Sequence, residues 1–238
     1  MTSLESGRKR RERGSITPDE IVEGAFAVAE RDTIDSLSVP EVAKYLGVGV
    51  TSIYWHFRKK EDLLRAMSDE AIRAVQQLMP STNTSSGWRD FLAEYFTTMR
   101  DVYRTNDTIA DLVLIRMSDY SRSSTNLSYE AVDRIVRMLV TAGFTPLNAW
   151  HVNATLSTFT RGIIMSERMQ RMQRLATVDE RQVRLLVPES MPYLSDLVGA
   201  NSISLSMASD EDFAFGLSIM LSAFERLLQT DRAAAADH

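Results

Sequence analysis

The stretch LGVGVTSIYWHFRKKEDLL, residues 46–64, decides the fold of this chain. Gly47 and Gly49 interrupt it, and glycine supplies the backbone freedom that a tight turn needs. We expect one helix to end at Gly47 and a short helix to follow, from about Val50 to Phe57. Two helices joined by such a turn form a DNA-binding helix-turn-helix or an ordinary helical hairpin, and spacing alone leaves both open.

Capping signals predict two helices upstream of this stretch. Thr17 can cap a helix whose first position is proline, and Glu20 stands three residues later, as in a capping box. Ser38 and Glu41 repeat the signal ahead of a second apolar segment. The chain therefore begins with three short helices.

Helical periodicity continues downstream, with a fourth helix from about Lys60 to Met79 that Pro80 ends. Further helices are expected over about 88–104, 108–120, 127–142, 146–174 and 210–229, and prolines predict broken helix and loop within 176–209. Since alternating β-branched residues are absent, the sequence predicts an all-α protein. A three-helix helix-turn-helix domain precedes a larger helical domain.

Four segments follow from this pattern. We expect a mobile basic arm over 1–15, the helix-turn-helix domain over 16–65, a helical effector-binding and dimerisation domain over 66–229, and a mobile tail over 230–238. The basic arm, which contains Arg8 to Arg13, is either a solvated tail or a phosphate-binding segment.

Composition excludes several classes of protein. Apolar residues make up 44% of the chain, enough for a core, and the lack of cysteine excludes disulfides and thiolate sites. No apolar run is long enough for a membrane span, and no secretory signal follows the basic start. We expect a cytoplasmic protein without membrane contact.

The net charge of −5 is unevenly distributed. The first 65 residues hold 11 basic and 11 acidic side chains, so the acidity belongs to the rest of the chain. All four lysines, including Lys44, Lys59 and Lys60, lie within the first 60 residues. This end of the chain can therefore approach phosphates.

Three consecutive elements carry a family resemblance: Leu46-Gly47-Val48, Ile53 to Phe57, and Lys60 to Leu64. In this order, over about residues 16–67, they are similar to the DNA-binding domain of the tetracycline-repressor (TetR) family, and Tyr54-Trp55-His56 repeats a tripeptide of the tetracycline repressor. The resemblance implies a homodimer that binds double-stranded operator DNA with its third helix and a small-molecule effector with its larger domain.

The first residues of such a recognition helix meet base edges, whereas later polar side chains reach phosphates. We expect Ile53, Trp55 and Phe57 in the core. Tyr54 either reaches a phosphate or covers that core. His56 as a metal ligand is disfavoured because His151 and His238 lie far off in sequence. The candidate DNA-binding residues are Val50, Thr51, Ser52, Tyr54, His56, Lys60, Lys59 and Lys44.

Two positions depart from the family pattern. Lys59 stands where many members have a capping residue, so the fourth helix needs another cap or gains a phosphate contact. Val39 and Pro40 replace a polar pair that helps the tetracycline repressor to hold the DNA backbone.

Aromatic and methionine side chains of the middle helices are candidates for an effector pocket, with ordinary core packing as the alternative. They are Tyr95, Phe96, Met99, Tyr103, Met117, Tyr120 and Phe159. Two small-residue ridges permit close helix approach and predict a dimer interface or, equally, internal packing. They are Ala154, Thr158 and Gly162, and Ala214, Ser218 and Ser222.

Neither a phosphate loop, a nucleophile elbow nor metal-ligand spacing occurs, so we expect no catalytic residue, no metal and no cofactor. Against the family pattern, Gln76 stands where the tetracycline repressor has a drug-binding histidine, which predicts an apolar or amphipathic effector instead. Ligand-independent or ligand-activated DNA binding, an architectural DNA binder and a helical enzyme are the alternatives. The fourth helix is expected to act as the lever between effector and DNA.

Overall fold

The computed structural model describes residues 16–82, 87–115, 120–172, 183–200, 203, 205 and 207–236. Every regular element within these ranges is a helix, which confirms the all-α prediction. The chain forms two compact units. The first comprises the described residues of Met1–Ala74 and Asp107–Thr125, and the second those of Val75–Asn106 and Asn126–His238. The basic arm over 1–15 lies outside the described residues.

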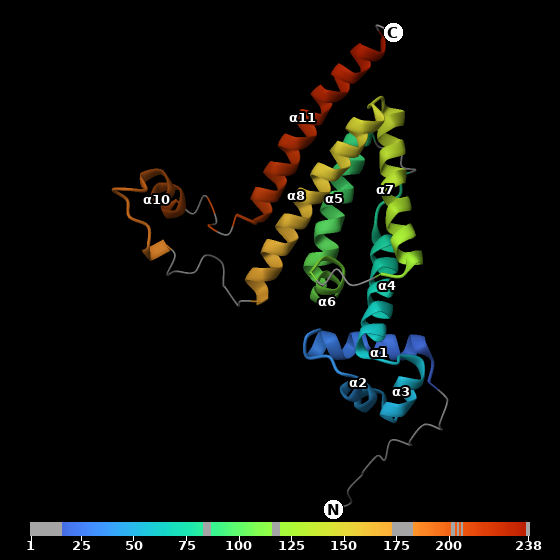
Figure 1. The fold of residues 1–238 in the computed structure, drawn as a ribbon. Coiled ribbons are helices and arrows are strands. Elements are labelled where there is room, and N and C mark those ends of the chain that lie inside the picture. The colour runs from blue at the N-terminus through green and yellow to red at the C-terminus, as the bar shows by residue number, and fades with distance from the viewer. Residues whose placement is uncertain are drawn as a thin grey trace, which may run out of the picture. The chain divides into compact units, whose positions relative to one another are not determined.

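The first unit contains α1 (Pro18–Arg31), α2 (Val39–Leu46), α3 (Val50–His56), most of α4 (Lys60–Leu78), α6 (Asp107–Ala110) and the π-helical turn η1 (Asp111–Ile115) (Figure 1). The capping box at α1 is confirmed, because the Thr17 hydroxyl accepts from the Glu20 amide and the Glu20 carboxylate accepts from the Thr17 amide. Proline at the first position then continues a helix without losing an internal hydrogen bond.

Apolar side chains from the first four helices meet in one core. Ile21 of α1, Val42 of α2 and Ile53 of α3 are fully buried, as are Leu63 and Met67 of α4. Gly24 permits α1 and α2 to approach closely, because a Cβ there would lie 2.7 Å from a methyl carbon of Leu46. This core fixes the orientation of α3 within the unit.

The second unit is built on α5 (Trp88–Thr105), α8 (Pro146–Met172) and α11 (Asp210–Ala236), which lie side by side (Figure 1). Most of α7 (Arg122–Ala142) and the short α10 (Pro192–Gly199) also belong to it. Phe91, Phe96 and Leu156 are among its fully buried side chains. None of the residues of α10 is buried.

The division between the units lies inside α4, after Ala74. This helix is continuous and ends at Leu78, just before Pro80, as predicted. Its first turn has main-chain support, because the Asp62 amide donates to the Lys59 carbonyl at 3.1 Å. The functional boundary at residue 65 stays a prediction.

Three predicted helix bounds were wrong. The segment 108–120 is not one helix, because α6 gives way to η1 after Ala110. The helix predicted from Leu127 begins at Arg122. The last helix continues past Gln229 to Ala236, so residues 230–236 are not an unstructured tail. Alanine favours helix, and the buried Asp231 carboxylate holds this end by accepting from the Thr145 amide at 2.9 Å.

Candidate nucleic-acid and ligand sites

A left-handed glycine makes the turn between α2 and α3. Gly47 has φ +68° and ψ 30°, a conformation that favours glycine, and the following Val48 amide donates to the Ala43 carbonyl at 3.0 Å. Only three residues separate Leu46 from Val50, the first residue of α3. The two helices thus have the geometry of a helix-turn-helix.

Helix α3 has a buried side and an exposed side. Ile53 is 0% exposed and Phe57, directly after the helix, is also buried, as predicted. Trp55 is 81% exposed, so its predicted place in the core is wrong. Residues 53 and 57 are four apart and share a face, whereas residue 55 lies on the opposite side of the helix.

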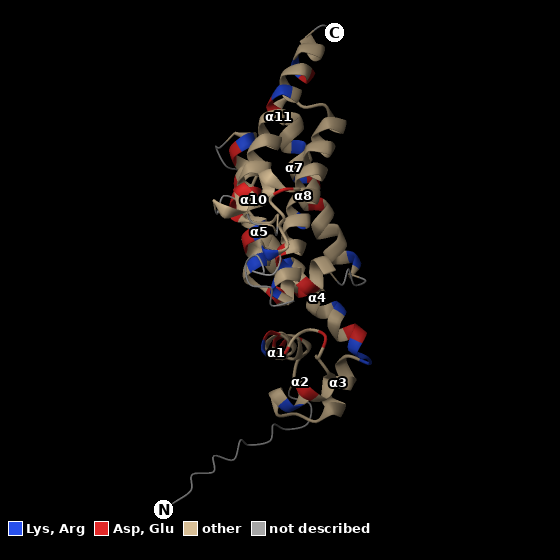
Figure 2. Ribbon diagram, turned by 90° about the vertical axis from the view of Figure 1, so that its left-hand side faces the viewer, with Lys and Arg blue, Asp and Glu red and all other residues tan. Residues whose placement is uncertain are grey.

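The exposed side of α3 presents methyl, hydroxyl and aromatic groups. Val50, Thr51 and Tyr54 are exposed and Ser52 is half-buried, so all four can reach another molecule. Figure 2 shows that α3 carries no lysine, arginine, aspartate or glutamate. An uncharged surface of this kind can contact base edges without a repulsive carboxylate.

Lysines lie at both flanks of α3. Lys44 is exposed near the end of α2, with its amino group 3.9 Å from the Glu41 carboxylate. Lys59 is exposed and Lys60 half-buried at the start of α4. In DNA-binding proteins, cationic side chains bind phosphates and the recognition helix contacts base edges. An uncharged helix between lysines fits this arrangement.

His56 already has a partner within the protein. Its Nε2 lies 2.9 Å from the Ile16 carbonyl oxygen, and only a protonated nitrogen can donate to that oxygen. In the neutral ring the remaining Nδ1 is an acceptor, which cannot bind a phosphate oxygen. Among the predicted phosphate contacts, Tyr54 and Lys60 therefore need no change of protonation, whereas His56 needs a second proton.

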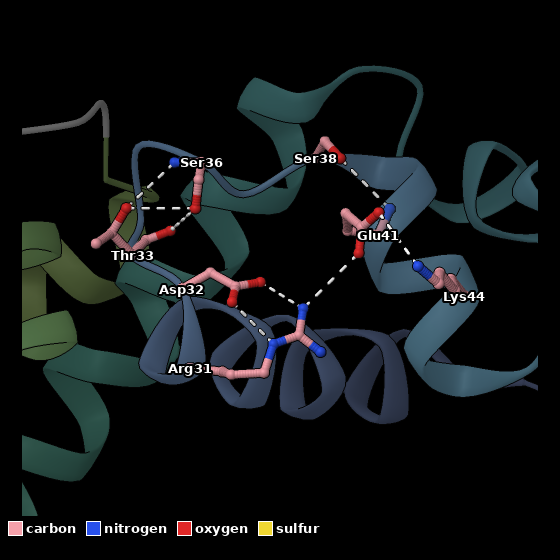
Figure 3. A network of polar contacts seen from close by, with 7 residues as sticks. All are labelled: Arg31, Asp32, Thr33, Ser36, Ser38, Glu41 and Lys44. Atoms are coloured by element: carbon pink, nitrogen blue, oxygen red, sulfur yellow. Dashed lines mark hydrogen bonds and ion pairs between the residues drawn. The ribbon is translucent and has the colours of Figure 1, made fainter.

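Polar contacts join the end of α1 to the start of α2 (Figure 3). The Arg31 guanidinium bonds to Asp32, which lowers the pKa of that carboxyl, and lies 3.7 Å from Glu41. The Ser38 hydroxyl accepts from the Glu41 amide at 3.4 Å. Only this half of the predicted capping box is formed, because the Glu41 carboxylate turns to Arg31 and Lys44 instead.

The candidate effector-binding residues occupy different surroundings. Phe96, Met99 and Tyr103 are buried on α5, and Phe159 stacks on Phe213 with ring centroids 5.7 Å apart. The Tyr120 hydroxyl, in the first unit, donates to the Val113 carbonyl at 2.7 Å. Met117 lies outside the described residues. Tyr95 lines a cavity of about 280 Å³.

The two small-residue ridges also differ. Thr158 and Gly162 are exposed on α8, and Ala154 is half-buried. On α11, Ala214 and Ser218 line a groove shared with α5, and the Ser222 hydroxyl accepts from Arg89 at 3.1 Å. The second ridge thus faces α5 of its own chain, whereas the first ridge is available to a partner.

A buried ion pair in the second unit was not predicted. Arg100 of α5 donates to the Glu167 carboxylate of α8 from Nε at 3.2 Å and from a terminal nitrogen at 2.5 Å. The same guanidinium contacts Asp210 at 2.7 Å and lies over the Phe213 ring at 4.7 Å. Arg100 follows Phe96 and precedes Tyr103 at helical spacing, so its position on the buried stripe was visible in the sequence.

The family follows from both parts of the chain. Residues 21–67 match the family of bacterial regulatory proteins named tetR, and residues 79–228 match the tetracyclin repressor-like C-terminal domain. The chain belongs to the TetR family. It is therefore a DNA-binding transcriptional regulator, and the resemblance noted in residues 46–64 is confirmed.

Relatives support this over the full length. The HTH-type transcriptional repressor Rv1353c of Mycobacterium tuberculosis is 33% identical over 240 residues, which is 100% of this chain and 91% of that protein. A possible TetR-family regulator of Streptomyces coelicolor has the same fold, with a TM-score of 0.68 at 20% identity over 89% of this chain and 100% of that one.

A second solved structure was determined with a ligand. ActR of Streptomyces coelicolor in complex with actinorhodin has a TM-score of 0.64 at 20% identity, covering 91% of this chain and 98% of that one. This likeness extends the shared fold through the second unit.

Within residues 16–236, gaps excepted, no three histidine, cysteine or carboxylate side chains gather where they would hold a metal ion. In the same ranges no helix is both long enough and apolar enough to cross a membrane.

Proposed function

We propose that this TetR-family regulator is a homodimeric repressor that binds a near-palindromic operator and leaves it when a small molecule binds. One observation carries the DNA-binding half. Helix α3 is anchored by the buried Ile53, exposes Thr51 and Tyr54 without a charged residue, and lies between lysines. Two such helices in a dimer would meet half-sites about 34 Å apart, one turn of DNA. The protein would then work wherever the chromosome lies, in the cytoplasm.

The exposed face of α8 supports a dimer. Its small residues, predicted to form a dimer interface, lie at helical spacing between the exposed Trp150 and Met165. On α11, Phe215 and Ile219 are also exposed. Large apolar side chains in water around a small-residue ridge fit burial against a second copy.

Release by an effector is supported by the cavity beside Tyr95 and by the likeness to ActR, which was solved with actinorhodin. Gln76 lines this cavity, and an amide cannot replace the imidazole that binds the drug in the tetracycline repressor. We therefore do not expect magnesium-tetracycline as the effector. Continuous α4 is the proposed link to the DNA-binding helices, and linkage requires operator and effector to weaken each other's binding equally.

Replacing Lys60 and Thr51 separates phosphate binding from base recognition. Lys60→Ala should weaken binding to every DNA sequence alike and reduce the salt dependence, by a slope of about 2 per dimer if each subunit loses one phosphate contact. Thr51→Val, which replaces the hydroxyl by a methyl group of similar size, should change the preferred base and leave that slope unchanged. Fluorescence anisotropy with DNA selected from a random pool, at several salt concentrations, measures both effects.

The matched control is Arg73→Ala on α4, because Arg73 is exposed and bonded to Glu70. It should leave both affinity and slope as in the wild type. The assignment of roles is contradicted if Lys60→Ala alters base preference, or if Thr51→Val lowers the salt slope.

A further inference from the structure

The cavity beside Tyr95 contains one charge. It is formed by the end of α4 and the residues after it, by α5 and by α7, all within the second unit. Its volume of about 280 Å³ is close to the lower end of known ligand pockets, about 300 Å³. Arg134 is the single charged residue of its described lining, which includes no carboxylate.

Three polar side chains in the lining are uncommitted. Within the described residues, neither the Gln76 amide, the Tyr95 hydroxyl nor the Arg134 guanidinium makes a hydrogen bond or ion pair. Arg134 is exposed, and Gln76 and Tyr95 are half-buried, so water can reach these donors. A ligand that fills the cavity displaces this water and must offer acceptors to the three donors, because an unmade hydrogen bond costs about 1–3 kcal/mol.

Within the described residues, Arg134 forms no ion pair with a neighbouring carboxylate. Asp133, the next carboxylate on α7, bonds to Arg137, and both line a second hollow that Glu130 and Arg134 also line. Burial raises the pKa of Tyr95, whereas the positive charges of Arg134 and Arg161 act to lower it. The Tyr95 hydroxyl therefore senses a positive potential from two helices, α7 and α8.

The rest of the lining combines the polar Ser81 and Thr82 with four apolar residues. Met79 and Pro80 follow α4, and Ala131 and Ile135 lie one turn apart on α7. A flat or compact apolar body would fit against these side chains. Its charged group would then meet Arg134, whose planar guanidinium can bind both oxygens of a carboxylate.

We propose that the effector of this regulator is a small apolar molecule with a carboxylate or similar anionic group, held by Arg134 with Tyr95 and Gln76 as donors. This refines the apolar effector expected from the sequence, and it rests on the proposed release by a ligand. Arg134 sets the charge of the ligand, whereas the apolar lining sets its size.

Two probes of equal shape test the charge. Calorimetry of the full-length protein without DNA should show 2-naphthoate binding at least tenfold more tightly than the neutral 2-naphthamide. Arg134→Met keeps an unbranched stem but removes the charge. This variant should bind 2-naphthoate at least tenfold more weakly and leave binding of 2-naphthamide unchanged.

Arg137→Met is the matched control, because Arg137 lies three residues further on α7 and lines the second hollow but not the cavity beside Tyr95. It should bind both probes as the wild type does. The proposal is overturned if 2-naphthoate fails to bind at millimolar concentration or binds no better than 2-naphthamide. It is also overturned if Arg137→Met removes binding, or if Arg134→Met weakens both probes equally.

Repeating the same titration with operator DNA present tests two claims separately: the anion site, and the release of DNA by an effector. Weaker 2-naphthoate binding in the presence of operator supports both. If 2-naphthoate binds through Arg134 and operator DNA leaves its affinity unchanged, the anion site stands and the proposed ligand-released repressor is wrong.

Discussion

Arg100→Met should destabilise the second unit by about 3–5 kcal/mol, because it leaves the Glu167 carboxylate buried without its cation. Glu167 is 8% exposed, and one of its oxygens already has no hydrogen-bond partner. Arg100 is 5% exposed and supplies both hydrogen bonds to the other oxygen. Urea unfolding followed by circular dichroism measures the loss.

The double variant Arg100→Met with Glu167→Met should recover most of that stability, since replacing both partners leaves no buried charge. Arg137→Met is the control, because its partner Asp133 is exposed and such pairs contribute about 1 kcal/mol or less. A single Arg100→Met variant as stable as the wild type would show that the buried pair does not hold α5 to α8.

Lowering the pH should also destabilise the second unit, through Asp210, the exposed carboxylate that contacts Arg100. Burial acts to raise the pKa of Asp210, but its hydrogen bonds to Arg104 and Arg100 outweigh burial and hold the pKa below its usual value. A carboxyl with a lowered pKa stabilises the folded state at neutral pH. That contribution is lost as the pH falls through the lowered pKa.

Ile53→Ala should cost the first unit about 2–5 kcal/mol and abolish operator binding, since it removes the side chain that anchors α3. Trp55→Ala, two residues away, should change the free energy of unfolding by no more than about 0.5 kcal/mol, because Trp55 is exposed. Urea unfolding of both variants measures the difference. Equal losses would place Trp55 in the core, as the sequence had indicated.

Local signals predicted the helix bounds near the start of the chain well. The capping box of Thr17 and Glu20, the helix end at Gly47 and the stop before Pro80 each depend on a few neighbouring residues, and each is confirmed. Trp55 was misplaced because a helix of seven residues is too short for its apolar pattern to define one face. The aromatic side chain of Trp55 favoured a place in the core. Residue 55, however, lies on the side of α3 opposite Ile53, and this position exposes it.

Contacts between distant segments were beyond the sequence. Helix α11 continues to Ala236 because Asp231 accepts from Thr145 and Asn148, which are more than 80 residues away. Arg100 and Glu167 are 67 residues apart, and neither position alone reveals its partner. Tyr95 was predicted in an effector pocket, but Arg134 was not, because it stands on an exposed part of α7 where a charge is ordinary.

If α3 reads a specific DNA sequence, the protein must prefer that sequence strongly, and a ratio of two affinities measures the preference. DNA selected from a random pool by the full-length protein should contain two inverted half-sites about one helical turn apart. At physiological salt the protein should bind this DNA at least about 10³-fold more tightly than a scrambled duplex of the same composition. Equal affinity for the selected and scrambled duplexes would contradict the account.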